Sequence, residues 1–314
     1  MSDLFLVTGG AGFIGSRLTA RLLADGARVR VLDNFNTGSL ANLAFGEAHG
    51  AAFELVPGDI RDLETVERAA AGVRAIFHQA AMRAVPRSLA DPLGAHENNV
   101  TGTLHVLEAA RRAGVRRVVY ASSSSVYGDR AELPQREDQA AAPLSPYAVS
   151  KLAGEQYARV WHRLYGVEAV GLRYFNVFGP HQDPLSTYAQ VVPRFILASL
   201  RGEPLEIHGD GAQSRDFAYV DNVVEANLLA FRAPDVGGEV FNVGSGERTS
   251  LLEFVARLQT IVGRALTRRH VAGRAGDVRH TLADLSKAKR QLGYVPLVTF
   301  DEGLARAVEY YRSL

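Results

Sequence analysis

The chain of 314 residues contains no cysteine, and this absence limits the chemistry that the protein can use. Without a thiol there is neither a disulfide framework nor a thiolate metal site, and the composition fits a reducing compartment. The nine histidines show no spacing typical of metal ligands, and His78, at the end of an apolar stretch, is expected to be structural. We therefore expect no bound metal.

Long apolar runs and an excess of charge of one sign are also missing. No segment approaches 18 apolar residues, and the N-terminus runs directly into an expected strand instead of a charged-then-apolar signal. Because 35 basic side chains are almost balanced by 34 acidic ones, little net electrostatic field would steer nucleic acid or an anionic membrane to the protein. We expect a soluble, cytoplasmic protein that binds neither.

What the sequence does contain is an alternation of short apolar segments and helical patterns. Beyond Gly179, prolines, glycines and short strands alternate with helices, which indicates a smaller mixed α/β lobe that completes a cleft. The alternation predicts an α/β fold with a doubly wound parallel sheet of the Rossmann type. Expected strands cover residues 4–9, 28–33, 52–59, 75–81, 116–123 and 168–175, and expected helices cover 12–25, 93–113, 147–165, 188–201, 220–232, 249–262 and 299–312.

Three glycines follow the first expected strand in the segment "TGGAGFIGS", at positions 9, 12 and 15. Missing side chains let the backbone approach a pyrophosphate, whose charge the N-terminus of a helix stabilises. Asp33 ends the second strand, where its carboxylate can accept hydrogen bonds from an adenosine ribose and would repel the additional phosphate of NADP. Gly9, Gly12, Gly15 and Asp33 therefore predict bound NAD.

The segment "SPYAVSK" places a tyrosine and a lysine one helical turn apart. Ser145 is expected to cap the helix and Pro146 to take its first position, so Tyr147 and Lys151 lie on one face of the helix. A free phenol has a pKa of about 10, and a nearby ammonium lowers it by about one to three units. The spacing is also that of a half-buried tyrosine and a solvated lysine, but the neighbouring motifs favour a functional pair.

The segments "GGAGFIG", "YASSSSVYG", "SPYAVSK" and "LRYFNVFGP" resemble the extended short-chain dehydrogenase/reductase family, in particular the UDP-hexose 4-epimerases. The similarity extends from the first strand to residues 274–294. It implies a catalytic triad of Ser123, Tyr147 and Lys151. It also implies cofactor contacts from Gly9, Gly12, Phe13, Ile14, Gly15, Asp33, Asn34, Asn36, Asp59, Ile60, Gln79, Ala80, Ala81, Arg83, Asn98, Tyr147, Lys151 and Phe175.

Epimerisation at C4 explains why bound NAD and a catalytic triad would be needed. The C4 hydrogen of a hexose is not adjacent to a carbonyl, so no side-chain base can remove it as a proton, whereas oxidation makes inversion possible. In the mechanism that the resemblance implies, Tyr147 takes the 4-hydroxyl proton while hydride passes to NAD+, and hydride then returns to the other face of the 4-keto sugar. Lys151 would hold the nicotinamide ribose, and Ser123 would bind the reacting oxygen.

The resemblance further implies a UDP-sugar substrate and a homodimer formed by helices 93–113 and 147–165. Arginine suits phosphate oxygens, and Arg215 and Arg274 would hold the diphosphate. A small residue, Thr281, stands beside the sugar's C2 substituent and favours N-acetyl groups, whereas Gln190 is larger than the alanine typical of members that accept them. The full expected substrate set is Arg87, Ser123, Ser124, Tyr147, Asn176, Gln182, Gln190, Val192, Arg215, Arg274, Asp277 and Thr281.

Three alternatives remain beside an NAD-dependent UDP-hexose 4-epimerase. A UDP-glucuronate 4-epimerase shares "ASSSSVYG", although residues 181–195 suit it less well. A sugar-nucleotide dehydratase needs an acid and a base, normally an Asp–Glu pair, where this chain has Ser124 and Ser125. A catalytically silent dinucleotide sensor predicts the loss of Tyr147 or Lys151, and both are present. The expected division is an NAD-binding domain with the catalytic residues over 1–178 and a mainly substrate-binding lobe over 179–314, interleaved with the first.

Overall fold

The computed structural model describes residues 2–129, 132–184, 190–272 and 278–314, and every structural statement below concerns these residues. Seven parallel strands form the central sheet, in the order β11-β6-β5-β4-β1-β2-β3. The expected α/β fold with a doubly wound sheet is confirmed. The strands are β1 (Leu4–Thr8), β2 (Arg28–Asp33), β3 (Phe53–Pro57), β4 (Ala75–His78), β5 (Arg117–Ser123), β6 (Glu168–Tyr174) and β11 (Val240–Val243).

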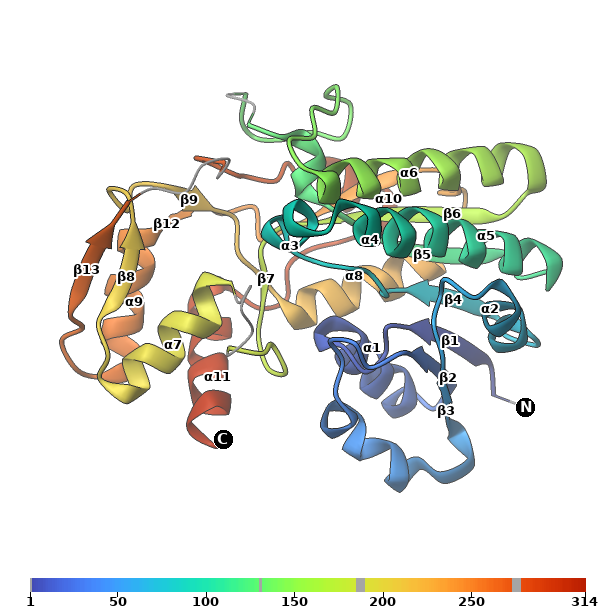
Figure 1. Ribbon diagram of the computed structural model, residues 1–314, viewed down its shortest axis with the longest axis horizontal. Coiled ribbons are helices and arrows are strands. Elements are labelled where there is room, and N and C mark those ends of the chain that lie inside the picture. Colours follow the sequence, from blue (N-terminus) through green and yellow to red (C-terminus); the bar gives the residue numbers. More distant parts are fainter. Residues whose placement is uncertain (1, 130–131, 185–189, 273–277) are drawn as a thin grey trace.

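Helices cover both faces of this sheet because successive apolar side chains of each strand point to opposite sides. In β1, Phe5 and Val7 belong to one hydrophobic core and Leu6 to another. The core containing Leu6 lies under α2 (Leu63–Ala70), α5 (Gly102–Arg112) and α6 (Pro146–Tyr165). The other core lies under α1 (Phe13–Ala24) and α8 (Val220–Arg232), which pack against each other on the opposite face (Figure 1).

The expected helix over 93–113 is present as a continuous helical stretch over 92–112 that contains a π-helical turn. The structure has α4 (Pro92–His96), a π-helical turn η2 (Glu97–Thr101) and then α5. Inside the turn, the buried Asn99 amide accepts a hydrogen bond from Met82 N at 2.7 Å and donates to Met82 O at 3.0 Å and to Ser150 Oγ at 2.9 Å. The wider turn therefore presents an amide that joins the segment after β4 to helix α6, as π-turns near functional sites often do.

A smaller lobe contains most of the chain after Gly179. Its helices α7, α9 and α11 enclose a cluster in which the Phe254 ring lies 5.7 Å from Phe195, 5.8 Å from Phe217 and 5.9 Å from Phe300, between ring centroids. The elements of this lobe and its border are β7 (Val177–Phe178), α7 (Val191–Arg201), β8 (Leu205–His208), β9 (Ser214–Arg215), β10 (Ala218–Tyr219), β12 (Thr249–Ser250), α9 (Leu251–Val262), β13 (Arg268–Val271), α10 (Ser286–Leu292) and α11 (Phe300–Arg312).

Residues 220–243 return from the smaller lobe to the large sheet. Helix α8 packs against β5 and β6, and β11 adds the seventh strand beside β6, a pairing that we did not assign from the sequence. The remaining elements are η1 (Leu40–Ala52), α3 (Val85–Ala90) and η3 (Ser124–Tyr127). η1 connects β2 to β3 and packs on α1, whereas α3 follows β4 and η3 follows β5. Within the described ranges, no helix combines the length and the apolar character needed to cross a membrane.

Candidate active site

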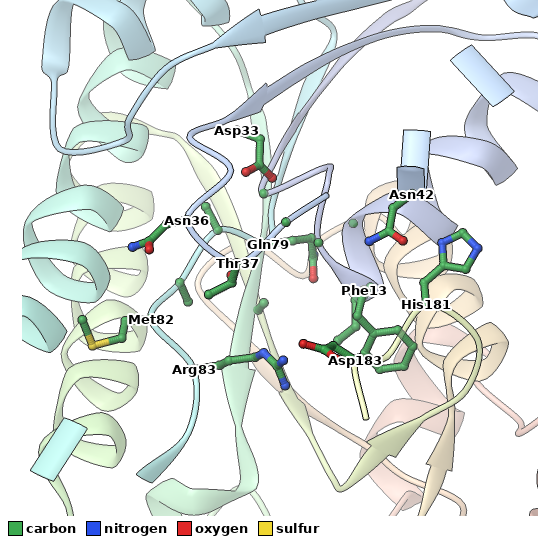
Figure 2. A pocket seen from close by; sticks show the side chains of 18 of the residues that line it. Phe13, Asp33, Asn36, Thr37, Asn42, Gln79, Met82, Arg83, His181 and Asp183 are labelled. Carbon is green, nitrogen blue, oxygen red and sulfur yellow. The ribbon is translucent and has the colours of Figure 1, made fainter. Parts of the chain in front are cut away.

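The carboxyl ends of β1, β2, β4 and β5 open onto one cleft of about 400 Å³. Polar side chains from separate segments meet around it, including Asp33 after β2, Gln79 and Arg83 after β4, and His181 and Asp183 beyond β7 (Figure 2). In doubly wound sheets this edge is where ligands bind, at the point where the strand order reverses. Here the reversal lies at β1, between β2 and β4.

The glycine motif forms the floor of the cleft and fits a diphosphate. Gly9 has φ 70°, and a Cβ atom there would lie 2.6 Å from Ala80 N; a Cβ on Gly15 would lie 2.1 Å from Gly9 O. Helix α1 begins at Phe13 after Gly12, and no side chain in the described part of the chain caps it. The backbone N–H groups of its first turn are therefore available to an anion.

Asp33 shapes the other wall of this region. Its carboxylate accepts hydrogen bonds from Ala11 N at 2.9 Å and Phe35 N at 2.8 Å, while burial raises the pKa of the group. Nearby, Asn34 Nδ2 donates to Asp59 Oδ2 at 2.8 Å. The Arg61 guanidinium hydrogen-bonds to Asp59 and lowers its pKa to about 2. Each Asp33 oxygen keeps a lone pair for a ribose hydroxyl.

Helix α6 begins as the sequence predicts. Ser145 is its N-cap residue, whose Oγ accepts a hydrogen bond from Ala148 N at 3.2 Å, and Pro146 occupies the first helical position. Ser88 on α3 accepts a hydrogen bond from Tyr147 N at 3.1 Å. These contacts hold the first turn of α6, and with it Tyr147, against the cleft.

Lys151 lies under Tyr147 and is buried. Its Nζ donates to Ala121 O at 2.8 Å and stands 5.2 Å from the centroid of the Tyr120 ring and 5.9 Å from that of Tyr147. Burial lowers the pKa of Lys151 to about 7. An ammonium in this position is therefore less favoured than the spacing in the sequence suggests.

The pKa of Tyr147 also differs from what the sequence predicts. Burial raises the pKa of Tyr147, whereas a hydrogen bond with Ser123 and the charge of Arg83 lower it. The expected lowering by Lys151 is not found in this structure, because the amine is itself buried and bonded to a carbonyl. The charge that favours the phenolate comes from Arg83, whose role as a neighbour of Tyr147 the sequence does not indicate.

Ser123 ends β5 and contacts the turn that follows it. Its Oγ accepts hydrogen bonds from Ser125 N at 3.2 Å and Ser125 Oγ at 2.9 Å, and hydrogen bonding to Ser123 lowers the pKa of Tyr147. Ser122, directly before it, lines the cleft, whereas Ser123 does not. Ser124 and Ser125 start η3, so hydroxyl groups occupy the positions where a dehydratase would need carboxyl groups.

Most of the predicted cofactor residues line the cleft together. Two do not: Asp59 stands behind Asn34, and Phe175 is fully buried in a separate cluster with Val126, Tyr127 and Ala283. The predicted cofactor residues that line the cleft are Gly9, Gly12, Phe13, Ile14, Gly15, Asp33, Asn34, Asn36, Ile60, Gln79, Ala80, Ala81, Arg83, Asn98, Tyr147 and Lys151, and Arg87 and Gln182 from the substrate set join them.

A second cluster joins three predicted substrate residues around Asp216. Asn176 Nδ2 donates to Asp216 O at 3.2 Å and to Thr281 Oγ1 at 3.3 Å, and Arg215 precedes Asp216 at the end of β9. The buried Asp216 carboxylate accepts hydrogen bonds from the backbone N–H groups of Ser245, Gly246 and Ala283. The cluster therefore holds four segments together.

The other predicted substrate residues have different surroundings. Gln190 is exposed and accepts a hydrogen bond from Gln182 Nε2 at 3.1 Å, whereas Val192 is buried in the hydrophobic core. Arg274 and Asp277 lie outside the described residues.

Several residues that line the cleft were not predicted as site residues. His181, in the segment "HQDP", forms a hydrogen bond between its Nδ1 and Ser16 Oγ at 3.1 Å, so it closes over the start of α1. The end of the chain also contributes, through Tyr310, Tyr311 and Leu314. No sequence pattern marks His181 as a site residue, and nothing in the sequence pattern places the C-terminal helix at this cleft.

His78 is structural, as expected. Its ring is buried, with Nδ1 2.7 Å from Thr8 Oγ1 and Nε2 3.0 Å from Thr103 Oγ1, and burial lowers its pKa to about 3. In the ranges that the structure describes, no three His, Asp or Glu side chains gather as metal ligands would.

Comparison with known proteins places this geometry among nucleotide-sugar enzymes. Residues 5–244 match the model of the NAD dependent epimerase/dehydratase family. A UDP-glucose 4-epimerase of Mycolicibacterium smegmatis is 43% identical over 310 residues, which are 98% of each chain.

Two solved structures are similar over almost the whole chain. One is a UDP-glucose 4-epimerase of Thermotoga maritima with UDP-glucose, with a TM-score of 0.93, 38% identity and 99% of each chain covered. The other is a UDP-N-acetylglucosamine 4-epimerase of Methanobrevibacter ruminantium in complex with UDP-N-acetylmuramic acid. Its TM-score is 0.94 at 36% identity, covering 100% of this chain and 99% of the other.

The burial of Lys151 leads to a prediction that the lysine content makes easy to test. The chain has only three lysines, so protein labelled with ¹³C at lysine Cε gives three side-chain signals. In ligand-free protein one signal should titrate with a pKa of about 7 and be absent from the spectrum of Lys151→Met. A Lys151 signal that first titrates near the ordinary value of about 10.4 would contradict the burial of its amine.

The sign of the effect on stability follows from the same pKa. The folded-state pKa of Lys151, about 7, lies below the unfolded value of about 10.4, so between these pH values the unfolded chain binds more protons. This group's contribution to the free energy of unfolding therefore rises as the pH rises through that window. Denaturant titrations of wild type and Lys151→Met across the window should show the rise only in the wild type.

Proposed function

The chain belongs to the NAD dependent epimerase/dehydratase family, and we propose that it inverts C4 of a UDP-hexose. The substrates would be UDP-glucose and UDP-galactose, their N-acetylated counterparts, or both. The observation that carries this proposal is the meeting of a glycine cradle, Asp33, Tyr147 and Lys151 in one cleft, with Ser123 next to its lining residue Ser122 and serines in place of acidic residues after Ser123.

Each group in the cleft has a part in this proposal. When bound, NAD supplies an acceptor and then a donor for the C4 hydride. In its phenolate form, which the charge of Arg83 favours, Tyr147 removes the proton of the 4-hydroxyl and later returns it, while Ser123 holds the same oxygen by a hydrogen bond. Lys151, whose amine already faces the cleft floor, binds the ribose beside the nicotinamide.

The cluster around Asp216 supports a role for the smaller lobe in holding the UDP part. Asn176 and Arg215 would hold the diphosphate, with Arg274 and Asp277 as further members of that set. Thr281 would stand beside the C2 substituent, and its Oγ1 already accepts hydrogen bonds from Asn176 and Asp216 N. Thr281 is small, which supports room for an N-acetyl group.

The division of labour between the two parts of the chain belongs to the same proposal. Residues 1–178 would bind NAD and provide the catalytic residues, and residues 179–314 would mainly bind the substrate. A cysteine-free chain that uses NAD and a nucleotide sugar would work in the cytoplasm. UDP-glucuronate remains the alternative substrate.

The proposal predicts that purified protein without added cofactor converts UDP-glucose, UDP-N-acetylglucosamine or both to their galacto epimers, with no net NADH. Proton NMR of the C4 configuration follows the reaction, and the ratio of the two rates measures the effect of Thr281 and Gln190. Tyr147→Phe should lower kcat by about 10²–10⁴-fold, because the proton acceptor is lost. UDP binding, measured by calorimetry, should persist in this variant.

If neither sugar is converted after NAD is supplied, the UDP-hexose assignment is wrong. Conversion of UDP-glucuronate alone would then establish the alternative. A Tyr147→Phe variant with unchanged kcat would remove Tyr147 from the mechanism.

We also propose that the protein is a two-fold homodimer formed through the outer faces of α4 and α6. Helix α6 exposes Val149, Val160 and Leu164, and Leu93 on neighbouring α4 is 76% exposed. Large side chains grouped on adjacent helices in this way are typical of an interface, because water contact with them is unfavourable. A two-fold axis would pair each patch with its copy.

The dimer predicts the mass of the particle in solution. Light scattering of wild type at micromolar concentration should give twice 34.0 kDa, and Val160→Glu with Leu164→Glu should give the monomer mass. Leu297→Glu, at a residue 62% exposed outside these helices, is the control and should remain dimeric. A wild-type monomer would exclude this interface.

A further inference from the structure

A buried ion pair lies one helical turn beyond Lys151, and the chemistry described above does not use it. Arg173 on β6 donates from Nε and Nη2 to the two carboxylate oxygens of Glu155 on α6, at 2.9 and 2.8 Å. The side chains are only 6% and 3% exposed. Removing two charges from water is unfavourable, so a pair in this position calls for an explanation beyond stability.

The helix geometry connects this pair to the cleft. Tyr147, Lys151 and Glu155 follow one another at intervals of four residues, so they lie along one face of α6, which packs on β5 and β6. Between Lys151 and Glu155 the helix approaches the sheet very closely, because a Cβ atom on Gly154 would lie 2.4 Å from the Tyr120 hydroxyl. The Tyr120 hydroxyl itself donates to Lys151 O at 3.1 Å.

The same pair also holds the residues on both sides of Ser123. Ser122 Oγ donates to Glu155 Oε1 at 2.5 Å. On the other side of Ser123, the turn η3 ends at Tyr127, whose ring centroid lies 4.7 Å from the Arg173 guanidinium carbon. The ion pair thus contacts Ser122, directly before Ser123, and Tyr127, at the end of the turn that follows Ser123.

We propose that Glu155 is a positioning residue: with Arg173 and Ser122 it fixes helix α6 against the end of β5 and thereby sets the contact between Tyr147 and Ser123. The expected loss of kcat rests on the proposed function, whereas the positioning of helix α6 does not. A carboxylate is required because both of its oxygens accept hydrogen bonds from Arg173 and one also accepts from Ser122. An amide at the same place would turn an NH2 group toward one of these donors.

The test uses Glu155→Gln together with a matched ion pair on the same strands. Arg117 on β5 and Glu168 on β6 are 2.6 Å apart at the opposite ends of these strands, away from the cleft. Glu168→Gln therefore breaks a similar pair without touching the carboxyl edge. Ser122→Ala is a milder third variant, because it removes only the hydrogen bond to Glu155.

Glu155→Gln should lower kcat by about 10- to 100-fold, because misplacement of a reacting group is costly even when binding is intact. KM for the UDP-sugar and Kd for UDP should change by less than about twofold, since the binding groups are untouched. Ser122→Ala should lower kcat in the same direction by a smaller factor. Glu168→Gln should lower the melting temperature without a selective fall in kcat.

A second readout does not need activity. Amide hydrogen exchange of residues 147–151 in ligand-free protein should become faster in Glu155→Gln and in Ser122→Ala, but not in Glu168→Gln, because only the first two release the start of α6 from β5. Unchanged exchange there in Glu155→Gln, or a loss of kcat in Glu168→Gln equal to that in Glu155→Gln, would overturn the proposal. If the wild type converts no UDP-sugar, the proposed function fails, whereas the exchange comparison still decides the role of Glu155.

Discussion

The central position of β1 is the constraint on which the candidate site depends. β1 pairs in parallel with β2 on one side and with β4 on the other. The connections of the two halves of the sheet therefore run to opposite sides of β1, which opens a crevice at its carboxyl end. Only glycine fits where the chain leaves β1, because Gly9 has a positive φ and lies against the backbone of Ala80. The cradle for a diphosphate is thus a consequence of how the sheet is wound.

Burial and charge oppose each other at the reacting end of this crevice. Burial raises the pKa of Tyr147 and lowers the pKa of Lys151, so both groups favour their neutral forms in this structure. The hydrogen bonding of Ser123 and the charge of Arg83 act in the opposite direction to burial, because both lower the pKa of Tyr147. The contact between Ser123 and Tyr147 is therefore one of two influences that favour the phenolate, and the Glu155–Arg173 pair lies where it can maintain that contact.

The parts predicted correctly from the sequence are those that depend on neighbouring residues. Residues 4–8 form β1 within the expected strand 4–9, since a buried parallel strand reads as a short apolar run, and Ser145 and Pro146 start α6 by local rules. β11 was not assigned to the sheet because four residues, three of them apolar, carry no sign of their partner strand. The effect of Arg83 on the pKa of Tyr147 could not be predicted from the sequence either, because it depends on distance and burial in the folded protein and not on spacing along the chain.

The central claim is that C4 is inverted by removal and return of hydride instead of a proton. The most direct test is to run the epimerisation of UDP-glucose or UDP-N-acetylglucosamine in D2O and to measure deuterium at C4 of the product. Hydride that stays within the cleft predicts no deuterium at C4, because the C4 hydrogen never exchanges with solvent. Deuterium incorporated at C4 in step with inversion would contradict the account.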